Sequence, residues 1–330
     1  MKPESKIRNE LALTSVAMLM LMSCQLAIGQ DYPSKPIKMI ANNSPGGVLD
    51  TLSRLVAGSL SQRAGVPVAV ENKPGAGGII GAEAVVRSAP DGYTLLFSAL
   101  DGLGVYPLAV KMPFNTATDL LPIAKMTEAF GLYVTSVKSP AKNIKEFIAL
   151  AKAQPGKLSI ASNGVGSTNH MNFELLKARA GIDIVHVPYK GSAAAGIPDT
   201  ISGRIDAMVT GIAPIRSHVL NGVLRVLVVT SPSRSTVFPD VPTMIESGFP
   251  SYVSGSLFGV FAPTGTPQEI VRKLARELSE IASSDEFGAL TAKIGAVKSV
   301  SVMEEFGRQI AEETRLWHTL AKEQNIRLSE

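Results

Sequence analysis

Residues 37–60 read IKMIANNSPGGVLDTLSRLVAGSL and join an apolar run to a stretch with helical spacing. The run at 37–41 has the composition of a buried strand. From Val48 onward, Val48, Leu52 and Leu55 recur on one face of a predicted helix. Two glycines and a proline lie between them, and we expect Gly47 to occupy a turn that a branched side chain would strain. This order is typical of a parallel α/β sheet, which binds ligands beyond the carboxyl ends of its strands.

The same alternation of strand and helix continues along the chain in two series, which predicts two similar α/β lobes. A proline-rich connection at 231–252 separates the second series from a last strand and three helices. The predicted strands cover 36–41, 67–71, 93–98, 132–137, 158–161, 185–187, 206–210, 225–230 and 257–261. The predicted helices begin near Val48 and Ile79 and cover about 143–153, 169–180, 192–202, 214–221, 267–283, 285–294 and 303–323.

Composition narrows the possible functions. The 330 residues are 45% hydrophobic and 18% charged, which is enough apolar material for two ordinary cores. The net charge of +4 is too small to indicate a nucleic-acid partner. The only cysteine of the sequence is Cys24 in the N-terminal segment, so the folded part has no thiol for disulfides, zinc–thiolate sites or a cysteine nucleophile. The sequence has only four histidines, and we expect neither a metal nor a cofactor.

The first 29 residues have the pattern of a signal peptide. Lys2, Lys6 and Arg8 precede an apolar run at 11–21, and small residues follow at 27–29. The run is about a dozen residues, whereas a membrane span needs roughly 20. We therefore expect export to the periplasm and cleavage before Gln30, with acylation at Cys24 as the alternative.

Five glycine-rich or hydroxyl-rich loops follow the predicted strands: NNSPGG, NKPGAGG, SALDGLG, ASNGVGST and VTGIAP. Glycine lets a ligand approach the backbone, and the free N–H groups of a first helical turn favour an anion. One helix terminus contributes about 0.3–1 kcal/mol, whereas micromolar affinity needs about 8 kcal/mol. Several loops from two lobes must therefore close together on a small carboxylate.

Several runs in the chain match a known family. The motifs ENKPGAGG, APDGYTLL and VHVPYKGSAAA, together with a glycine-rich first loop, resemble the solute-binding receptors of tripartite tricarboxylate transporters, often called Bug proteins. The resemblance implies a two-lobed, type II-like Venus-flytrap fold of the periplasmic binding proteins, with a mostly parallel sheet flanked by helices in each lobe. It places 30–131 and 254–330 in the first lobe and 132–253 in the second.

The resemblance also implies a function and partners. Receptors of this kind bind small carboxylates, including amino acids, and deliver them to membrane permease subunits or to a signalling protein. The backbone of residues 44–47 and 74–78 would hold one carboxylate. The chain departs from the family pattern at Asn42–Ser44, at 99–104 and at Thr210, so no relative's substrate is transferred to it. We expect a monomer that is not an enzyme.

Most candidate residues also have a structural interpretation. Asp50 suits a helix cap, Ser167 and Thr168 suit an N-cap, His170 suits packing, and Asp101 either caps a turn or accepts a hydrogen bond from an ammonium or hydroxyl group. An exported hydrolase built from a loop serine, His170 and Asp101 is the alternative from another class, but the chain lacks a G-x-S-x-G elbow. The candidate ligand-binding residues are Asn43, Ser44, Gly46, Gly47, Asp50, Gly75, Ala76, Gly77, Ser98, Asp101, Asn163, Gly166, Ser167, Thr168, His170 and Thr210.

Overall fold

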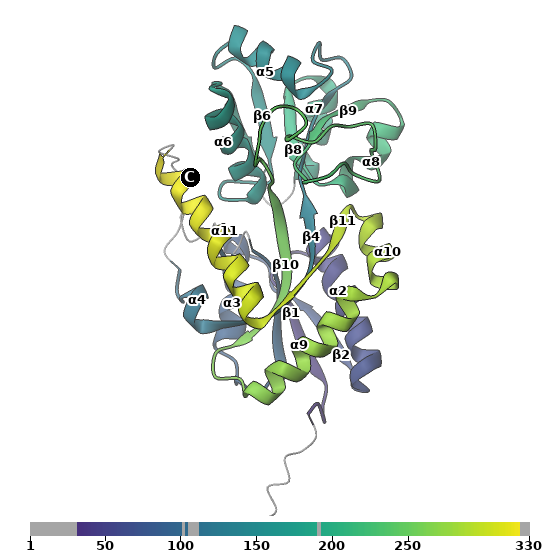
Figure 1. Cartoon of the computed structure of the whole chain (residues 1–330), viewed down its shortest axis with the longest axis vertical. Coiled ribbons are helices and arrows are strands. Elements are labelled where there is room, and N and C mark those ends of the chain that lie inside the picture. The colour runs from purple at the N-terminus through teal and green to yellow at the C-terminus, as the bar shows by residue number, and fades with distance from the viewer. Residues whose placement is uncertain (1–31, 101–102, 105–111, 190–192, 324–330) are drawn as a thin grey trace, which may run out of the picture.

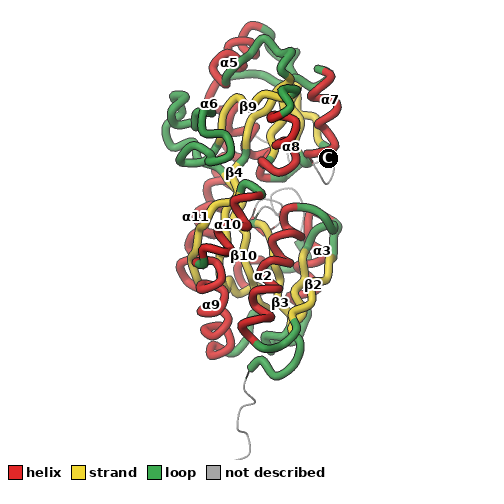
Figure 2. The backbone as a smooth tube through the Cα atoms, turned by 90° about the vertical axis from the view of Figure 1, so that its right-hand side faces the viewer, coloured by secondary structure: helices red, strands yellow, loops and turns green. Residues whose placement is uncertain are grey.

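The computed structural model describes residues 32–100, 103–104, 112–189 and 193–323. The predicted signal peptide, Cys24 and Asp101 lie outside these residues. Two α/β lobes are stacked along the long axis and meet at the level of β4 and β10 (Figures 1 and 2). The predicted two-lobed α/β architecture is therefore confirmed.

The first lobe contains a six-stranded sheet with the strand order β11-β4-β10-β3-β1-β2. Its helices pack on this sheet, with α2 and α9 in contact with one another. The strands are β1 Ile37–Ala41, β2 Val68–Asn72, β3 Thr94–Ala99, β4 Leu120–Phe130, β10 Gly255–Pro263 and β11 Ala296–Val302. The helices are α2 Val48–Ala64, α3 Ile79–Val86, α4 Thr116–Asp119, α9 Gln268–Ser283, α10 Asp285–Lys293 and α11 Met303–Glu323, with a 3-10 turn η1 at Ala76–Gly78.

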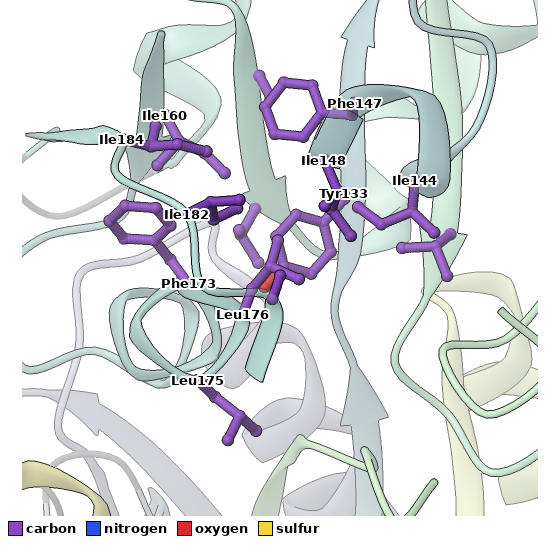
Figure 3. Packing of buried hydrophobic residues seen from close by; sticks show 14 of the residues in the cluster. Tyr133, Ile144, Phe147, Ile148, Ile160, Phe173, Leu175, Leu176, Ile182 and Ile184 are labelled. Atoms are coloured by element: carbon purple, nitrogen blue, oxygen red, sulfur yellow. The ribbon is translucent and has the colours of Figure 1, made fainter. Parts of the chain in front are cut away.

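The second lobe contains a five-stranded sheet with the order β7-β6-β8-β5-β9. Its strands are β5 Leu132–Ser136, β6 Ser159–Ser162, β7 Val185–Pro188, β8 Ala207–Thr210 and β9 Leu224–Val229. Its helices are α5 Ile144–Ala153, α6 Thr168–Ala180, α7 Ile197–Ser202 and α8 Ile212–Leu220, with a 3-10 turn η4 at Ala193–Gly196. Aromatic and branched side chains from β5, α5 and α6 fill one face of this sheet (Figure 3).

Most predicted elements appear within a few residues of their expected bounds, but β4, β11 and the short α4 were not predicted. Both missed strands belong to the first sheet and carry register shifts against their partners. Such bulges break the alternation of buried and exposed residues that marks a strand in a sequence. In β4, Pro122, Lys125 and Glu128 also interrupt the apolar residues.

Both sheets are mixed because the chain crosses between the lobes. The strands β1, β2 and β3 pair in parallel, whereas β10 runs antiparallel to β3 and β4. In the second sheet β6 pairs in parallel with β7 and β8, whereas β5 runs antiparallel to β8 and β9. The strands β5 and β10 each enter a lobe from the other one, so they run against the parallel strands there. The expected lobe boundaries at 131 and 253 stay a prediction.

The two chain crossings are held together by Thr230. Its backbone N–H donates to Gly131 O at 2.9 Å, and its hydroxyl oxygen accepts from the Gly131 N–H at 2.9 Å. The Ser254 N–H donates to Thr230 O at 3.1 Å. The connection from β4 to β5 and the connection back to β10 therefore form one hydrogen-bonded unit.

Helix α11 is a third link between the lobes (Figure 1). Phe306 near its beginning packs in a buried cluster of the first lobe, where its ring centroid lies 5.4 Å from that of Phe261. Trp317 near its end is 2% exposed and belongs to the buried cluster of the second lobe, together with Tyr133 and Phe173. The same helix is thus anchored in both cores.

Candidate ligand-binding site between the lobes

Strand direction brings the two sets of glycine-rich loops face to face. The strand β4 runs toward the second lobe, because Leu132 of β5 follows Phe130 after one residue. Both β4 and β3 pair antiparallel with β10, so β3 and its parallel partners β1 and β2 also end toward the second lobe. In the second lobe β5 runs away from the first, so β8, β6 and β7 end toward it. The ends of β1, β2, β3, β6, β7 and β8 therefore face the space between the lobes, as expected for a ligand site in α/β sheets.

Asn42 ties together the three strand ends of the first lobe. Its side chain is buried, and its Nδ2 donates to Gly78 O at 3.2 Å and to Ser98 Oγ at 3.0 Å. These partners lie at the beginning of α3 and at the end of β3. Ser98 is fully buried and donates to Ala99 O, so its hydroxyl is part of this connection. We had not placed Asn42 among the candidates, although a polar residue at the end of an apolar strand is a signal for such a role.

The contacts of Asp50 are those of a residue that shapes the first loop. Its Oδ2 accepts from the Gly46 N–H at 2.9 Å, and its Oδ1 accepts from Asn72 Nδ2 at 2.9 Å and lies 3.0 Å from Arg54 Nη2. Burial opposes ionisation, but these three groups outweigh it and hold the pKa of Asp50 below its usual value. Both oxygens are therefore engaged within the protein, in agreement with the capping interpretation.

The second loop of the first lobe is a tight turn with four consecutive residues at positive φ. The values are 122° for Gly75, 47° for Ala76, 62° for Gly77 and 96° for Gly78. Glycine adopts this region at little cost. A Cβ atom at Gly78 would lie 2.4 Å from Nδ2 of Asn42, so glycine is also required there by close approach.

The helices α2 and α3 both begin at a glycine, Gly47 and Gly78, and neither has a side-chain cap. Residues 44–47 and 74–77 in the preceding loops are exposed. The first-turn N–H groups are thus not taken by an N-cap side chain, and they carry the positive end of each helix dipole. The strain expected at Gly47 is absent, because its φ is −83°; the positive φ of 85° belongs to Gly46.

The second lobe contributes the beginnings of α6 and α8. Ser167 caps α6 by accepting from the His170 N–H at 3.2 Å, as predicted for an N-cap. The helix α8 begins after Gly211 without a side-chain cap. Thr210 at the end of β8 is 1% exposed.

His170 and His186 form a stacked pair beneath the loop at 163–167, which we call the second-lobe loop. Their ring centroids are 4.1 Å apart with an angle of 16° between the planes. Burial, followed by the positive charges of neighbouring groups, lowers the pKa of His170 to about 3 and that of His186 to about 4. Both rings are therefore neutral near pH 7. His170 is 4% exposed, so its ring is packed within the lobe, as in the structural interpretation.

Acid should destabilise the protein through this pair. Both histidines titrate near pH 6.5 when unfolded, so the unfolded chain binds more protons below that pH and stability falls as the pH drops toward 4. The expected slope is on the order of 1 kcal/mol per pH unit for each ring. Urea unfolding at pH 7, 6, 5 and 4.5 gives the free energy of unfolding at each pH and hence this slope. The double variant His170→Asn with His186→Gln should have a flatter profile, and equal slopes in both proteins would contradict this origin.

A hydrolase-like arrangement is not assembled among the described residues. Ser162 Oγ lies 2.7 Å from His186 Nε2, which is the distance of a nucleophile and its base. Ser162 is fully buried, however, and its oxygen accepts from the Gly164 N–H at 3.1 Å. His170 contacts His186 and Glu174 rather than a loop serine hydroxyl of the first lobe.

The candidate residues divide by exposure, and Asp101 is outside the described chain. The exposed ones can reach a ligand between the lobes: Ser44, Gly46, Gly47, Gly75, Ala76 and Gly77. The half-buried ones lie at the loop rims: Asn43, Asn163 and Ser167. The buried ones shape the loops from below: Asp50, Ser98, Gly166, Thr168, His170 and Thr210. Residues that sequence reasoning missed are Asn42, Asn72, Ser162 and His186, which act in the loops through contacts distant in sequence.

One facing loop in each lobe carries an asparagine oxygen that has no hydrogen-bond partner within the described protein. These atoms are Oδ1 of Asn43 in the first lobe and Oδ1 of Asn163 in the second, and both are buried. A buried acceptor without a partner costs about 1–3 kcal/mol. A donor on a ligand, such as a hydroxyl group, or a water molecule would satisfy them.

A pocket of about 340 Å³ also lies between the lobes, and its lining includes none of the described candidate residues. Ile212 at the beginning of α8, residues 231–237, Ala292 and residues 295–299 contribute to this lining. Its basic side chains are engaged, because Arg234 pairs with Glu246 and Lys298 lies 3.8 Å from Asp285. The facing loops therefore remain the candidate site.

The described residues lack two features. Within the described ranges, no group of three or more histidine, cysteine, aspartate or glutamate residues could hold a metal ion. In the same part of the chain, no helix combines the length and the apolar character needed to cross a bilayer.

Two α/β lobes with facing loops at their strand ends define a periplasmic binding protein, a class of solute-binding receptors. Residues 52–326 match the family described as the tripartite tricarboxylate transporter family receptor. The chain belongs to this family. It is 36% identical over 302 residues to Protein BugT of Bordetella pertussis, with 90% of this chain and 91% of the relative covered.

Solved structures agree with the fold. A Rhodopseudomonas palustris protein with adipate superposes with a TM-score of 0.82 at 29% identity, covering 89% of this chain and 99% of the other. MatC from the same organism, with bound malate, gives a TM-score of 0.75 at 28% identity, covering 88% and 99%. The periplasmic binding protein BugD gives 0.78 at 29% identity, covering 91% and 100%.

Proposed function

We propose that the protein is an extracytoplasmic receptor that captures a small carboxylate between its lobes and delivers it to the permease of a tripartite transporter. The observation that carries the proposal is the convergence of helices α2, α3 and α8, which begin at glycines without side-chain caps, on the space between the lobes. Each such terminus favours an anion by about 0.3–1 kcal/mol, and more when water is excluded. Three of them from two lobes also make binding depend on lobe closure.

The charges around the first loop are compatible with an anion. Asp50 is the carboxylate nearest to the beginning of α2, and it is neutralised by Arg54 and by its hydrogen bonds to Gly46 and Asn72. It therefore adds little repulsion toward a bound carboxylate, while it holds Gly46 in place. The unpartnered oxygens of Asn43 and Asn163 favour a ligand that also carries a hydroxyl or another donor.

Relatives with ligands support a carboxylate as the solute. The two R. palustris proteins of similar fold were solved with adipate and with malate, both of which are dicarboxylates. Malate carries a hydroxyl group and adipate does not. Comparing the affinities of this protein for malate and for adipate therefore tests whether the two asparagine oxygens contribute to ligand selectivity.

Calorimetry against a panel of mono-, di- and tricarboxylates, with malate and adipate among them, tests the proposal. The protein should bind at least one of them saturably, and the solute should be recovered unchanged. A ligand at one hundred times its Kd should stabilise the protein by about 2.7 kcal/mol. Neutral sugars serve as the control, since the exposed residues 44–47 and 74–77 include no aromatic side chain. Binding of a sugar with no binding of any carboxylate would overturn the proposal.

The variant Gly47→Val tests the first loop directly. Its backbone φ of −83° is open to valine, and an added Cβ would lie 3.1 Å from the side-chain atom Asn43 Nδ2 and 3.9 Å from Ser44 O, so the fold should persist. The branched side chain would stand beside the first-turn N–H groups of α2, and carboxylate binding should weaken by at least about tenfold. Gly58→Ala in the same helix, where nothing lies within 4 Å, is the matched control. Equal affinity in both variants would show that the ligand lies elsewhere.

In this proposal residues 1–29 act as a signal peptide that directs export to the periplasm. Mass spectrometry of protein purified from the periplasm should find a mature chain that begins at Gln30. A diacylglycerol adduct on a chain beginning at Cys24 would instead establish a lipoprotein. Delivery to a permease predicts that cells lacking this receptor lose uptake of the solute found in the panel.

A further inference from the structure

The backbone of the second-lobe loop is held by two histidine rings. The Gly166 N–H donates to His170 Nδ1 at 3.2 Å. The Gly164 N–H donates to Ser162 Oγ at 3.1 Å, and this oxygen lies 2.7 Å from His186 Nε2. Two N–H groups of one short loop thus end on imidazole nitrogens, one directly and one through a hydroxyl group.

These contacts assign the proton of the His170 ring and favour one position for the proton of the His186 ring. His170 Nδ1 accepts a hydrogen bond, so the proton of the neutral ring is on Nε2, which lies 3.8 Å from Glu174 Oε1. The Ser162 hydroxyl has two acceptors within reach, His186 Nε2 at 2.7 Å and Gly164 O at 3.3 Å. The shorter contact favours donation to His186 Nε2, with the His186 proton on Nδ1. The geometry therefore favours opposite tautomers for the two histidines.

Packing makes the pair and the loop one unit. The stacked rings lie 4.1 Å apart, and the Phe173 ring covers His186 at 5.7 Å. The charged groups that face the pair are Glu174 and Lys177 of α6, and the strand β6 carries no titratable residue. Protonation of His170 would convert Nδ1 from an acceptor into a donor and break its link to the Gly166 N–H.

We propose that His170 and His186 are positioning residues, which act as neutral hydrogen-bond acceptors to hold the second-lobe loop in the conformation that receives the carboxylate. The inference rests on the proposed function for its ligand, but the loop geometry is independent of it. His170 thus acts through Gly166 and not through a contact of its ring with the solute, since the ring is buried.

The first test is ligand-free and uses the full-length mature protein. Nitrogen NMR of protein labelled with ¹⁵N-histidine should show His170 with its proton on Nε2 and His186 with its proton on Nδ1 at pH 7. The four histidines of the chain can be assigned by single substitutions. The same tautomer for both, or exchange between tautomers at either ring, would overturn the proposal.

The second test exchanges the acceptors. His170→Asn keeps an acceptor near the Nδ1 position and His186→Gln keeps one near Nε2, whereas His170→Leu and His186→Leu keep only volume. With malate and adipate as probes, the leucine variants should bind about tenfold more weakly and the amide variants close to wild type. Equal losses in the amide and leucine variants, or wild-type affinity in the leucine variants, would overturn the proposal.

The failure of the proposed function can be told apart from the failure of this inference. If the wild type binds neither probe, the carboxylate proposal fails for these solutes. The amide hydrogen exchange of Gly164 and Gly166 then decides: it should be slow in the wild type and amide variants and fast in the leucine variants. Equal exchange rates in all proteins would show that the rings do not hold the loop.

Discussion

Replacing Trp317 by alanine should lower the free energy of unfolding by about 3–5 kcal/mol, the cost of removing a large side chain from a core. Trp317 is 2% exposed in the core of the second lobe, and Nε1 donates to Glu313 Oε1 at 3.3 Å. The substitution also detaches the end of α11 from the second lobe. We therefore expect two separate unfolding transitions where the parent protein has one.

Urea unfolding followed by circular dichroism measures this effect, because the substitution removes the only tryptophan. Leu316→Ala is the matched control, since Leu316 is 53% exposed and precedes Trp317 in the same helix. Its free energy of unfolding should change by no more than about 0.5 kcal/mol. A loss below 1 kcal/mol in Trp317→Ala would show that α11 does not join the two cores.

Gly81→Ala should destabilise the first lobe by about 1–3 kcal/mol, as overpacking does. An added Cβ would lie 2.7 Å from Asn42 Cβ, 2.8 Å from Lys73 O and 2.9 Å from Asn42 Cα. Lys73 O and Asn42 Cα are backbone atoms, which cannot move away by a rotamer change as the end of a flexible side chain can. The helix α3 must shift instead, which moves Gly78 away from Asn42 and loosens both glycine-rich loops of the first lobe.

The matched comparison is Gly58→Ala, which makes the same change in helix α2. Gly58 is exposed and has nothing within 4 Å of an added Cβ, so alanine should stabilise the protein by about 0.5–1 kcal/mol. Thermal denaturation should therefore shift in opposite directions for the two variants. The same direction of shift in both would show that α3 does not pack directly on the Asn42 backbone.

Most of the fold could be predicted from the sequence because the parallel strands and their helices follow one another locally. The run at 37–41, the glycine loop and the helix from Val48 have the same order in both pattern and structure. The strands β4 and β11 could not be predicted in this way. They pair with segments more than a hundred residues away, and bulges interrupt their alternation.

The candidate site was predictable as a set of loops but not as a set of contacts. Glycine content identified residues 44–47 and 75–77, which are exposed at the ends of parallel strands. Asn42 and His186 act through partners 36 and 24 residues away, at Gly78 and Ser162. No local pattern reports such contacts.

The hydrogen bonds of Thr230 to both chain crossings restrict how the two lobes can move. The two crossing segments cannot slide past one another without breaking these hydrogen bonds. Swinging through small torsional changes on either side of this connection leaves the bonds intact, as in a hinge and not in a shear motion. The two lobes would then rotate about this fixed connection to enclose a solute. The length of the solute would set the angle at which closure stops.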